Sequence, residues 1–173
     1  MFSYRAVALS GSAAKAATSA RTLDDDPGRD VDRHPRTSLP FMAVGYQWRG
    51  DFANDELNAL HAETFAHRLL EDDWRGKVER HSLGRVVARA GDEVVGFVNV
   101  AWDGGVQAFV LDTMVAAMAS RQGTGTRLVS AAVEGARAAG CEWAHVDFED
   151  QLRGFYFGAC GFTPTNAGLI ALR

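Results

Sequence analysis

The sequence predicts one α/β domain over residues 41–173, in which helices pack on a β-sheet. Two observations predict this class. Strand-like and helix-like segments alternate from residue 41 onward, and a glycine-rich turn joins a hydrophobic strand to an amphipathic helix. With 173 residues, of which 47% are hydrophobic and 23% charged, the chain has room for one ordinary globular domain. No internal repeat indicates a second one.

Residues 1–40 differ in composition from the rest of the chain. They are rich in Ala and Ser, then in Asp and Arg, and show no sustained helical or strand period. Such a segment buries too little apolar surface to offset the entropy of ordering, so we expect a disordered tail. No apolar run of signal-peptide length follows Arg5, and Met42 could be the native first residue.

The domain begins with a strand and two helices. Residues 41–48 read as the strand, and Asn54 is the expected N-cap of the first helix, with acidic residues in its first turn. The second helix is expected from residue 70 onward, where apolar side chains recur every four residues. The apolar stripes of the two helices consist of Leu57, Leu60 and Phe65, and of Leu70, Trp74 and Val78.

Three strands follow, rich in Val and Phe. They are expected over residues 85–89, 94–102 and 107–115, with turns at Gly91-Asp92 and at residues 103–105. The third of these strands leads into the glycine-rich turn.

The C-terminal part continues the alternation of helices and strands. The helix after the glycine-rich turn has one apolar stripe and ends at Gly140. A strand is then expected over residues 141–148 and a short helix over 150–159. A last strand over 169–172 is expected to close the sheet.

The glycine-rich turn lies where a strand gives way to a helix. The first turn of a helix carries unpaired N–H groups and about half a positive charge, and glycine lets a ligand approach that backbone closely. Gly123 and Gly125 therefore predict a phosphate-binding turn, with a tight turn that binds nothing as the alternative. Leu128 replaces the third glycine of a dinucleotide fingerprint, and no P-loop Gly-Lys-Ser/Thr follows. The other residues of the turn are Arg121, Gln122, Thr124 and Thr126.

The spacing of Gly123 and Gly125 resembles the diphosphate loop of the GNAT N-acetyltransferase superfamily, Arg/Gln-x-x-Gly-x-Gly/Ala, which holds acetyl-coenzyme A. Two positions depart from that pattern. Ser120 stands at the usual Arg/Gln position, and Ala117 stands where a proline is common. These departures weaken the side-chain contribution of the loop and leave its backbone contribution intact.

A second segment, Phe155 to Phe162, resembles the Phe-Tyr-x-x-x-Gly-Phe helix end of the same family. Tyr156 lies one residue further from Gly161 than in that pattern, and Phe157 occupies the strict tyrosine position. We expect a one-residue bulge that keeps Tyr156 in the role of the tyrosine. The order of elements from residue 41 onward is also similar to that of the GNAT fold.

The resemblance implies a mixed, mostly antiparallel sheet of six to seven strands flanked by four helices, with two strands splayed apart to admit acetyl-CoA. It implies transfer of an acetyl group from acetyl-CoA to a primary amine by direct attack. Main-chain donors at the end of a splayed strand would serve the thioester and the pantetheine arm. The residues expected to bind acetyl-CoA are Met114 and Val115 on that strand, and Arg121, Gln122, Gly123, Thr124, Gly125 and Thr126 around the diphosphate.

An amine acceptor must lose a proton before it attacks. An alkylamine of pKa ~10.4 is neutral in roughly one molecule in 2,500 at pH 7, a handicap of about 4.6 kcal/mol, so a base is required. Asp112 interrupts an apolar strand and is the first candidate, with hydrogen-bonded support of the strand as its alternative role. The other candidates are Glu63 and His61, and the cluster Glu71, Asp72 and Asp73. That cluster otherwise reads as a solvated face, and His61 and His145 as packing or surface histidines.

Departure of CoA leaves a thiolate that needs a proton, and Tyr156 is the expected donor. A core tyrosine packed on neighbouring aromatic rings is its alternative. In the resembled fold, the segment 63–82 and the loop 102–104 shape the acceptor site, and the acidic character of these segments favours a small cationic amine. The residues expected to contact the acceptor are Glu63, Trp74 and Trp102.

Charge and composition argue against other partners. The net charge of −4 disfavours nucleic acid, and no apolar run approaches the ~20 residues that span a bilayer. Cys141 and Cys160 read as reduced core thiols of a cytoplasmic protein rather than as a disulfide or a catalytic Cys–His pair, and no metal site is expected. An exposed edge strand could support a homodimer. A CoA-binding regulatory module without turnover is the alternative function.

Overall fold

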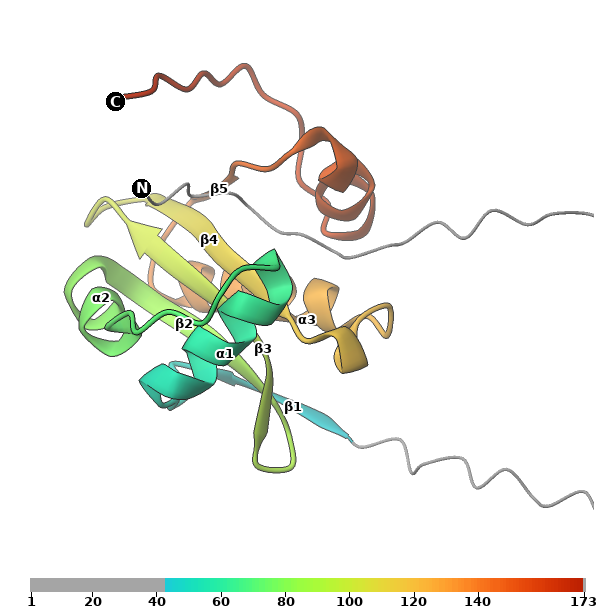
Figure 1. Ribbon diagram of the computed structural model, residues 1–173. Helices are drawn as coiled ribbons and strands as arrows, with labels where there is room; N and C mark the ends of the chain where they lie inside the picture. Colours follow the sequence, from blue (N-terminus) through green and yellow to red (C-terminus); the bar gives the residue numbers. More distant parts are fainter. Residues whose placement is uncertain (1–42, 173) are drawn as a thin grey trace, which may run out of the picture.

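The computed structural model describes residues 43–172, which form one sheet with helices on both faces (Figure 1). Each of the first four strands pairs antiparallel with the next one among them, and the fifth runs parallel to the fourth. This confirms the α/β class with a mixed, mostly antiparallel sheet. The tail expected over residues 1–40 lies outside the described residues. In their order across the sheet, the strands are β1 (Val44–Trp48), β2 (Ser82–Ala90), β3 (Glu93–Trp102), β4 (Gln107–Val115) and β5 (Trp143–Val146).

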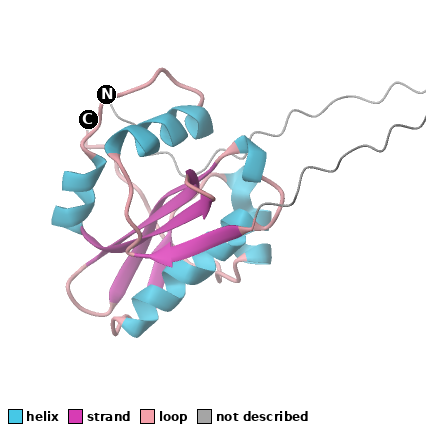
Figure 2. Ribbon diagram, turned by 90° about the horizontal axis from the view of Figure 1, so that it is seen from below, coloured by secondary structure: helices cyan, strands magenta, loops and turns pink. Residues whose placement is uncertain are grey.

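Helices cover both faces of the sheet (Figures 1 and 2). On the first face, Phe97 of β3 packs edge to face against Phe52 and Trp74, and on the second face Gly96 lies beneath Leu128. β3 is therefore buried on both faces from Val94 to Val100, and neither face is exposed to solvent there. The helices are α1 (Asn54–Phe65) and α2 (Trp74–His81) on the first face, α3 (Thr124–Ala138) on the second, and the short η1 (Ala117–Ala119), η2 (Asp150–Leu152) and η3 (Gly154–Ala159).

The predicted N-cap of α1 is wrong. The cap is Ala53, whose N–H donates to the Glu56 carboxylate at 2.8 Å. Asn54 joins α1 to α2 instead: its amide donates to Asp73 (3.2 Å) and accepts the N–H of Arg75 (2.8 Å). The side-chain amide of an asparagine at a helix start can cap that helix. Here the same amide group bonds to the second helix instead.

The second helix starts at Trp74 rather than near Leu70. Asp73 caps it by accepting the N–H of Gly76 at 3.0 Å, and residues 66–73 form the connection from α1. The four-residue spacing from Leu70 to Trp74 therefore crosses the helix start. Trp74 and Val78 are buried in the core, whereas Leu70 is half-buried in the connection.

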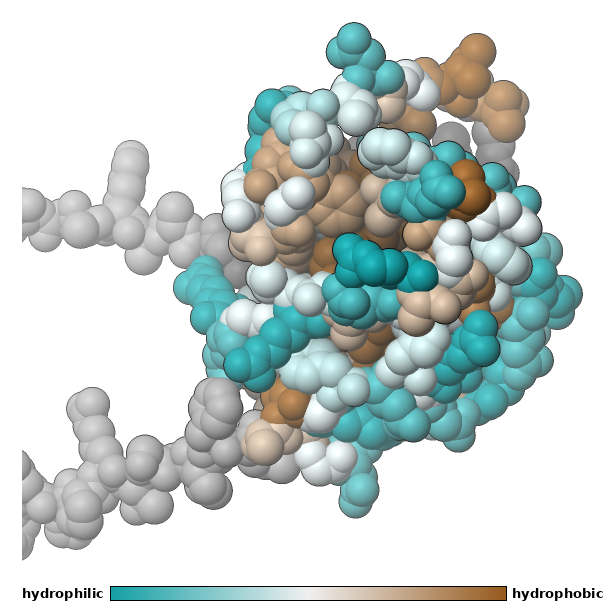
Figure 3. All heavy atoms as spheres, turned by 180° about the vertical axis from the view of Figure 1, so that it is seen from behind, coloured by the Kyte–Doolittle hydropathy of each residue, from teal (hydrophilic) through white to brown (hydrophobic). Residues whose placement is uncertain are grey.

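The predicted strand over residues 169–172 is wrong. No strand is present among residues 160–172, and Leu169, Ile170 and Leu172 are 85%, 84% and 92% exposed. They form a hydrophobic group at the upper right of Figure 3. An apolar segment becomes a strand only where it pairs with an edge, and none of the described residues pairs with the outer edge of β5. The sheet has five strands instead of the expected six to seven.

The indole of Trp48 on β1 is held between two glycines, Gly84 on β2 and Gly135 on α3. A Cβ added at either glycine would lie 2.4 Å from an atom of the ring, which is closer than heavy atoms can approach. Either the ring or the helix would have to move. We therefore expect Gly135→Ala to lower the free energy of unfolding by about 1–3 kcal/mol, although alanine favours a helix.

Chemical denaturation measures this effect. The control is Ser130→Ala at an exposed position of the same helix, where a change of no more than about 0.5 kcal/mol is expected. If Gly135→Ala were as stable as the wild type, the contact between Trp48 and α3 would not be tight.

Candidate functional site

Strands β4 and β5 separate partway along the sheet. Their pairing covers only residues 107–110 of β4 and 143–146 of β5, while β4 continues to Val115. Residues 111–115 therefore have no strand partner on the β5 side within the described part of the chain. This is the separation of two strands that the resemblance implied.

A bulge in β4 begins the separation. The register shifts between Phe97 and Asn99, so that Val98 of β3 faces two residues of β4, Asp112 and Thr113. Asp112 has φ +50°, a left-handed value that Asp tolerates better than most residues. A bulge bends its strand and re-aims its side chains. Asp112 consequently contacts α2 on one face, and Thr113 contacts η3 on the other.

The first turn of α3 follows this strand and carries free donors. Gly123 is the N-cap, with φ +80°, and no side chain caps the helix. The first helical hydrogen bond runs from the N–H of Arg127 to the carbonyl of Gly123 (3.1 Å), so the N–H groups of residues 124–126 have no partner inside the helix. No loop or side chain within residues 43–172 accepts a hydrogen bond from them. This helix end can bind an anion.

Three elements meet at Gly125, in the first turn of α3. A Cβ there would lie 3.2 Å from the ring of Phe155 on η3 and 3.7 Å from the side chain of Val115 at the end of β4. Met114, the residue before Val115, is fully buried. The structure thus brings together the glycine-rich turn, the end of the separated strand and the aromatic C-terminal segment.

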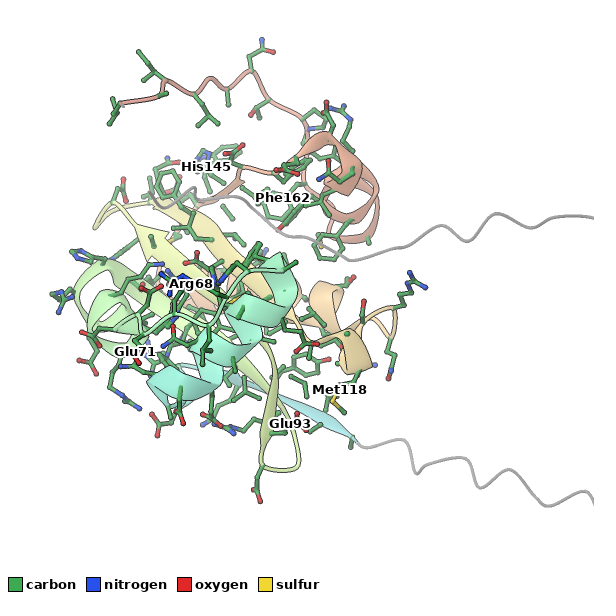
Figure 4. All side chains as sticks on the ribbon, in the orientation of Figure 1. Arg68, Glu71, Glu93, Met118, His145 and Phe162 are labelled. Atoms are coloured by element: carbon green, nitrogen blue, oxygen red, sulfur yellow. The ribbon has the colours of Figure 1, made fainter. Side chains whose placement is uncertain are left out.

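The longer side chains of the turn point outward. Arg121 is exposed and has φ +59°. The Gln122 amide donates to the carbonyl of Met118 (2.8 Å), so it bonds within its own loop, where the Met118 side chain is also exposed (Figure 4). Thr124 is buried, and Thr126 is half-buried. Most of the unpaired hydrogen-bond donors of this turn therefore belong to its main chain.

The expected one-residue bulge near Tyr156 is present as a π-helix. In η3 the N–H of Cys160 donates to the carbonyl of Phe155, five residues back, at 2.9 Å. A π-helical turn holds one residue more than an α-helical turn, and such turns are frequently found at functional sites. The extra residue lets Tyr156 be buried, while Phe157 is only half-buried.

The Tyr156 hydroxyl reaches the separated part of β4. It donates to Thr113 Oγ1 at 3.4 Å, and its ring stacks on Phe148 at 4.7 Å. Phe155 and Phe162 pack edge to face against it, with Phe162 lying between η3 and the sheet (Figure 4). Burial raises the pKa of Tyr156 to about 12, against the smaller opposing effect of the bond to Thr113. The phenol is therefore protonated at physiological pH.

Asp112 is held in a polar cluster on the face covered by α1 and α2. Its carboxylate accepts from Lys77 Nζ (3.1 Å) and from the Asn99 amide (3.3 Å). Ser82 donates to Asn99 at 2.6 Å and completes the cluster. These bonds match the supporting role that the sequence left open for Asp112.

The three residues expected to contact the acceptor do not lie together. The Glu63 carboxylate accepts the N–H of Ala117 (2.8 Å), just past the end of β4. Trp102 pairs with Ala108, near the start of β4. Trp74 is 3% exposed and belongs to the core beneath α1 and α2. Glu63 and Trp102 are thus separated by the length of β4.

The acidic cluster after α1 divides into different environments. Glu71 is exposed (Figure 4). Asp72 is half-buried, and its main-chain N–H donates to Asn58 (3.1 Å). Asp73 caps α2, and the N–H of Gly76 that it accepts lowers its pKa. One of the three carboxylates is therefore a structural cap.

A pair of histidines lies at the end of α1. His61 Nδ1 is 2.6 Å from His67 Nε2, and His67 Nδ1 is 2.6 Å from the carbonyl oxygen of Arg68. Helical spacing does not predict this contact between residues six apart. It arises because α1 ends at Ala66 in the left-handed conformation, which turns the chain back over its last turn. The signal that could have revealed the pair is a second histidine shortly after the end of a helix that already carries one.

His145 stacks on Phe109 and bonds to Gln107, as expected for a packing histidine on the surface. Cys141 and Cys160 are both free, and burial raises the pKa of Cys160 to about 11. Residues 43–172 contain no group of three or more His, Cys, Asp or Glu residues that could hold a metal ion. Nor does any helix in this part of the chain have the length and apolar character to cross a membrane.

Comparison with known proteins agrees with this architecture. A GNAT family acetyltransferase from Streptococcus pneumoniae TIGR4 has the same fold, with a TM-score of 0.60 at 22% identity over 76% of this chain and 100% of that one. An aminoglycoside acetyltransferase from an uncultured soil metagenomic sample, solved with trehalose, gives 0.60 at 15% identity over 75% and 95%. AAC(6')-Iy, in complex with the bisubstrate analogue CoA-S-monomethyl-acetylneamine, gives 0.60 at 14% identity over 76% and 98%.

The family model of the acetyltransferase (GNAT) family matches residues 46–162. The chain therefore belongs to the GNAT acetyltransferase family, as its two local patterns indicated. No curated protein matches it. The identities to the solved structures are low, so these structures establish the fold and leave the acceptor to the geometry of the site.

Proposed function

We propose that this protein uses acetyl-CoA to acetylate a primary amine on a small cationic molecule by direct attack. The observation that carries the proposal is the uncapped first turn of α3, whose N–H groups at residues 124–126 follow the strand that parts from β5. When bound, acetyl-CoA supplies an activated acetyl thioester. The residues of this chain bind it, orient it and move protons around it.

The helix end fits a diphosphate. A Cβ at Gly123 would meet no atom within 4 Å among the described residues, so a ligand can approach the main chain there. Arg121 and Arg127 are exposed on either side of the turn and offer positive charge. An anion at this place gains hydrogen bonds from residues 123–126 and the favourable end of the helix dipole.

The separated strand fits the pantetheine arm and the thioester. Residues 111–115 lack a partner on the β5 side, so amide groups of a ligand can pair with them as an added strand would. Val115, whose main-chain N–H points away from β3, is the donor we assign to the thioester carbonyl, where negative charge develops, whereas the N–H of Met114 points toward β3. The Tyr156 hydroxyl, 3.4 Å from Thr113 Oγ1, is the donor we assign to the departing sulfur.

The acceptor class is supported by charge. Glu63, Glu71 and Asp72 contribute carboxylates at or near the protein surface on the face covered by α1 and α2. Carboxylates attract cationic amines and repel anionic ones. We therefore expect small polycationic amines to be better acceptors than neutral or anionic monoamines.

The test has two arms, acetyl-CoA binding and turnover. Saturation at about 100 Kd adds ~2.7 kcal/mol to the stability of a true binder, so acetyl-CoA is expected to raise the unfolding temperature. Release of free thiol is then measured with a panel of amines. A protein that is stabilised but releases no thiol with any amine would be a CoA-binding module without turnover. The absence of any stabilisation would remove the proposal altogether.

A further inference from the structure

We propose that His61 accepts the proton of the attacking amine and that His67 is its positioning residue. This role rests on the proposed transfer to an amine and specifies the base that such a transfer requires. Four steps support it: the position of His61, the direction of its hydrogen bonds, the charges around it, and the engagement of the other candidate bases.

His61 is connected to the bulge at which β4 leaves β5 through two side chains of α2, Trp74 and Lys77. Its ring centroid is 5.2 Å from that of Trp74, and Lys77 Nζ lies 4.2 Å from the same indole ring. Lys77 in turn contacts Asp112 at the bulge, 3.1 Å away. His61 is half-buried, so part of its side chain is exposed to solvent.

The hydrogen bonds determine which nitrogen of His61 is available. The carbonyl of Arg68 can only accept, so His67 Nδ1 carries a hydrogen. In a neutral His67, Nε2 is then an acceptor, and His61 Nδ1 must donate to it across 2.6 Å. This leaves the lone pair of a neutral His61 on Nε2. The tautomers of both rings follow from the geometry because this row of hydrogen bonds ends at a carbonyl, which can only accept.

The proton transfer balances at His61 Nε2. An N–H bond of the ammonium breaks, its electron pair stays on the amine nitrogen, and a new N–H bond forms at Nε2. The Nδ1–H bond to His67 remains in place throughout, so the pair needs no rearrangement. His67 holds the ring orientation in the way that a carboxylate or carbonyl orients other catalytic histidines.

The charges around His61 suit a base that is neutral before the reaction. Burial lowers its pKa, and so does the neighbouring His67, while Asp112 opposes the shift. The other charged groups that act on it are Lys77 on α2, which lowers the pKa further, and Asp72 on the loop after α1, which raises it. Asp112 therefore stabilises the imidazolium once it forms.

Three of the five carboxylates that the sequence offered as bases are already engaged, and Glu71, one of the other two, is exposed. Asp112 accepts from Lys77 and Asn99, and Glu63 accepts the N–H of Ala117. Asp73 caps α2. His61 Nε2 is a basic atom on this face that takes no part in the hydrogen bonds of the histidine pair, so it can accept a proton.

One test needs no turnover. Nitrogen NMR of the imidazoles in the full-length protein reports which ring nitrogen carries the hydrogen, and the five histidines are assigned by single substitutions. In the neutral form of each ring we expect the hydrogen of His61 and of His67 on Nδ1, and we expect His67→Gln to change the His61 signals. A hydrogen on Nε2 of His61, or His61 signals indifferent to His67→Gln, would overturn the inference.

The second test is kinetic, with the matched control His81→Gln at an exposed position of α2. For an alkylamine at pH 7, we expect His61→Gln to lower kcat/KM about 100-fold and to leave acetyl-CoA binding unchanged. In the wild type, kcat/KM should rise with pH through a pKa below the ordinary imidazole value and then level off. His61→Gln should remove that step, and His67→Gln should shift it and cost about 10-fold.

An acceptor amine that is already neutral at the assay pH provides the internal comparison. It needs no proton removed before it attacks, and the one proton that its nitrogen loses afterwards balances the one that the CoA thiolate takes up, so His61→Gln should then cost only a few-fold. If the wild type turned over and His61→Gln did so equally well with an alkylamine, the inference would fail while the proposed function stood. If the wild type released no thiol with any amine, both would fail together.

Discussion

Thr126→Glu is expected to weaken acetyl-CoA binding about 10- to 100-fold while leaving the protein as stable as before or more so. Residue 126 is the third position of α3, where a glutamate can reach back to the free N–H groups of the turn. Its carboxylate would occupy the donors proposed for the diphosphate and repel the ligand. A lost charge-assisted hydrogen bond costs about 1.5–3 kcal/mol, which corresponds to that loss of affinity.

The opposite signs of the two effects make the result specific. An acidic residue in the first turn of a helix favours folding by about 0.3–1 kcal/mol, so general damage to the fold cannot explain weaker binding. Calorimetric titration with acetyl-CoA and chemical denaturation measure the two quantities. Ser130→Glu, exposed one turn further along α3, adds the same charge away from the helix end and should leave both almost unchanged. Unchanged affinity in Thr126→Glu would place the diphosphate elsewhere.

Tyr156→Phe is expected to lower kcat about 10-fold or more without changing the Kd of acetyl-CoA. The phenol has a pKa of about 12, whereas a thiol resembling cysteine has one of about 8.5. Complete proton transfer to the thiolate would be uphill by roughly 5 kcal/mol. Tyr156 should therefore act as a hydrogen-bond donor to the developing thiolate, and losing a donor to a charged group costs about 1.5–3 kcal/mol.

Steady-state thiol release measures this effect, and the ring packing on Phe148 is kept by phenylalanine. Tyr46→Phe removes a hydroxyl from β1, at the other edge of the sheet, and serves as the matched control. Equal kcat in wild type and Tyr156→Phe would assign the tyrosine to the core alone.

The sequence predicted the elements whose signals are local. β4 spans the predicted residues 107–115, and its transition into the glycine-rich turn and α3 is as expected. The bulge at Tyr156 could be predicted because the spacing to Gly161 was one residue too long, and a helix end accommodates one extra residue as a bulge. Each of these features depends on neighbouring residues, so it can be read from the chain.

The features that were missed depend on contacts between distant residues. Asn54 bonds to α2 rather than capping α1, and Leu169 to Leu172 meet no strand edge. The pairing of His61 with His67 depends on the left-handed conformation of Ala66, which an alanine in the sequence does not predict. Likewise, Asp112 could be recognised as an unusual residue in a strand, while its bonds to Lys77 and Asn99 required the fold.

Titration of the nitrogen-labelled protein with acetyl-CoA, followed through the main-chain amide signals, tests the central claim most directly. If the diphosphate binds at the start of α3, the amides of residues 123–126 should show the largest shifts, together with those of residues 113–115 on the separated strand. Saturable binding that leaves the amides of residues 123–126 unmoved would contradict the account.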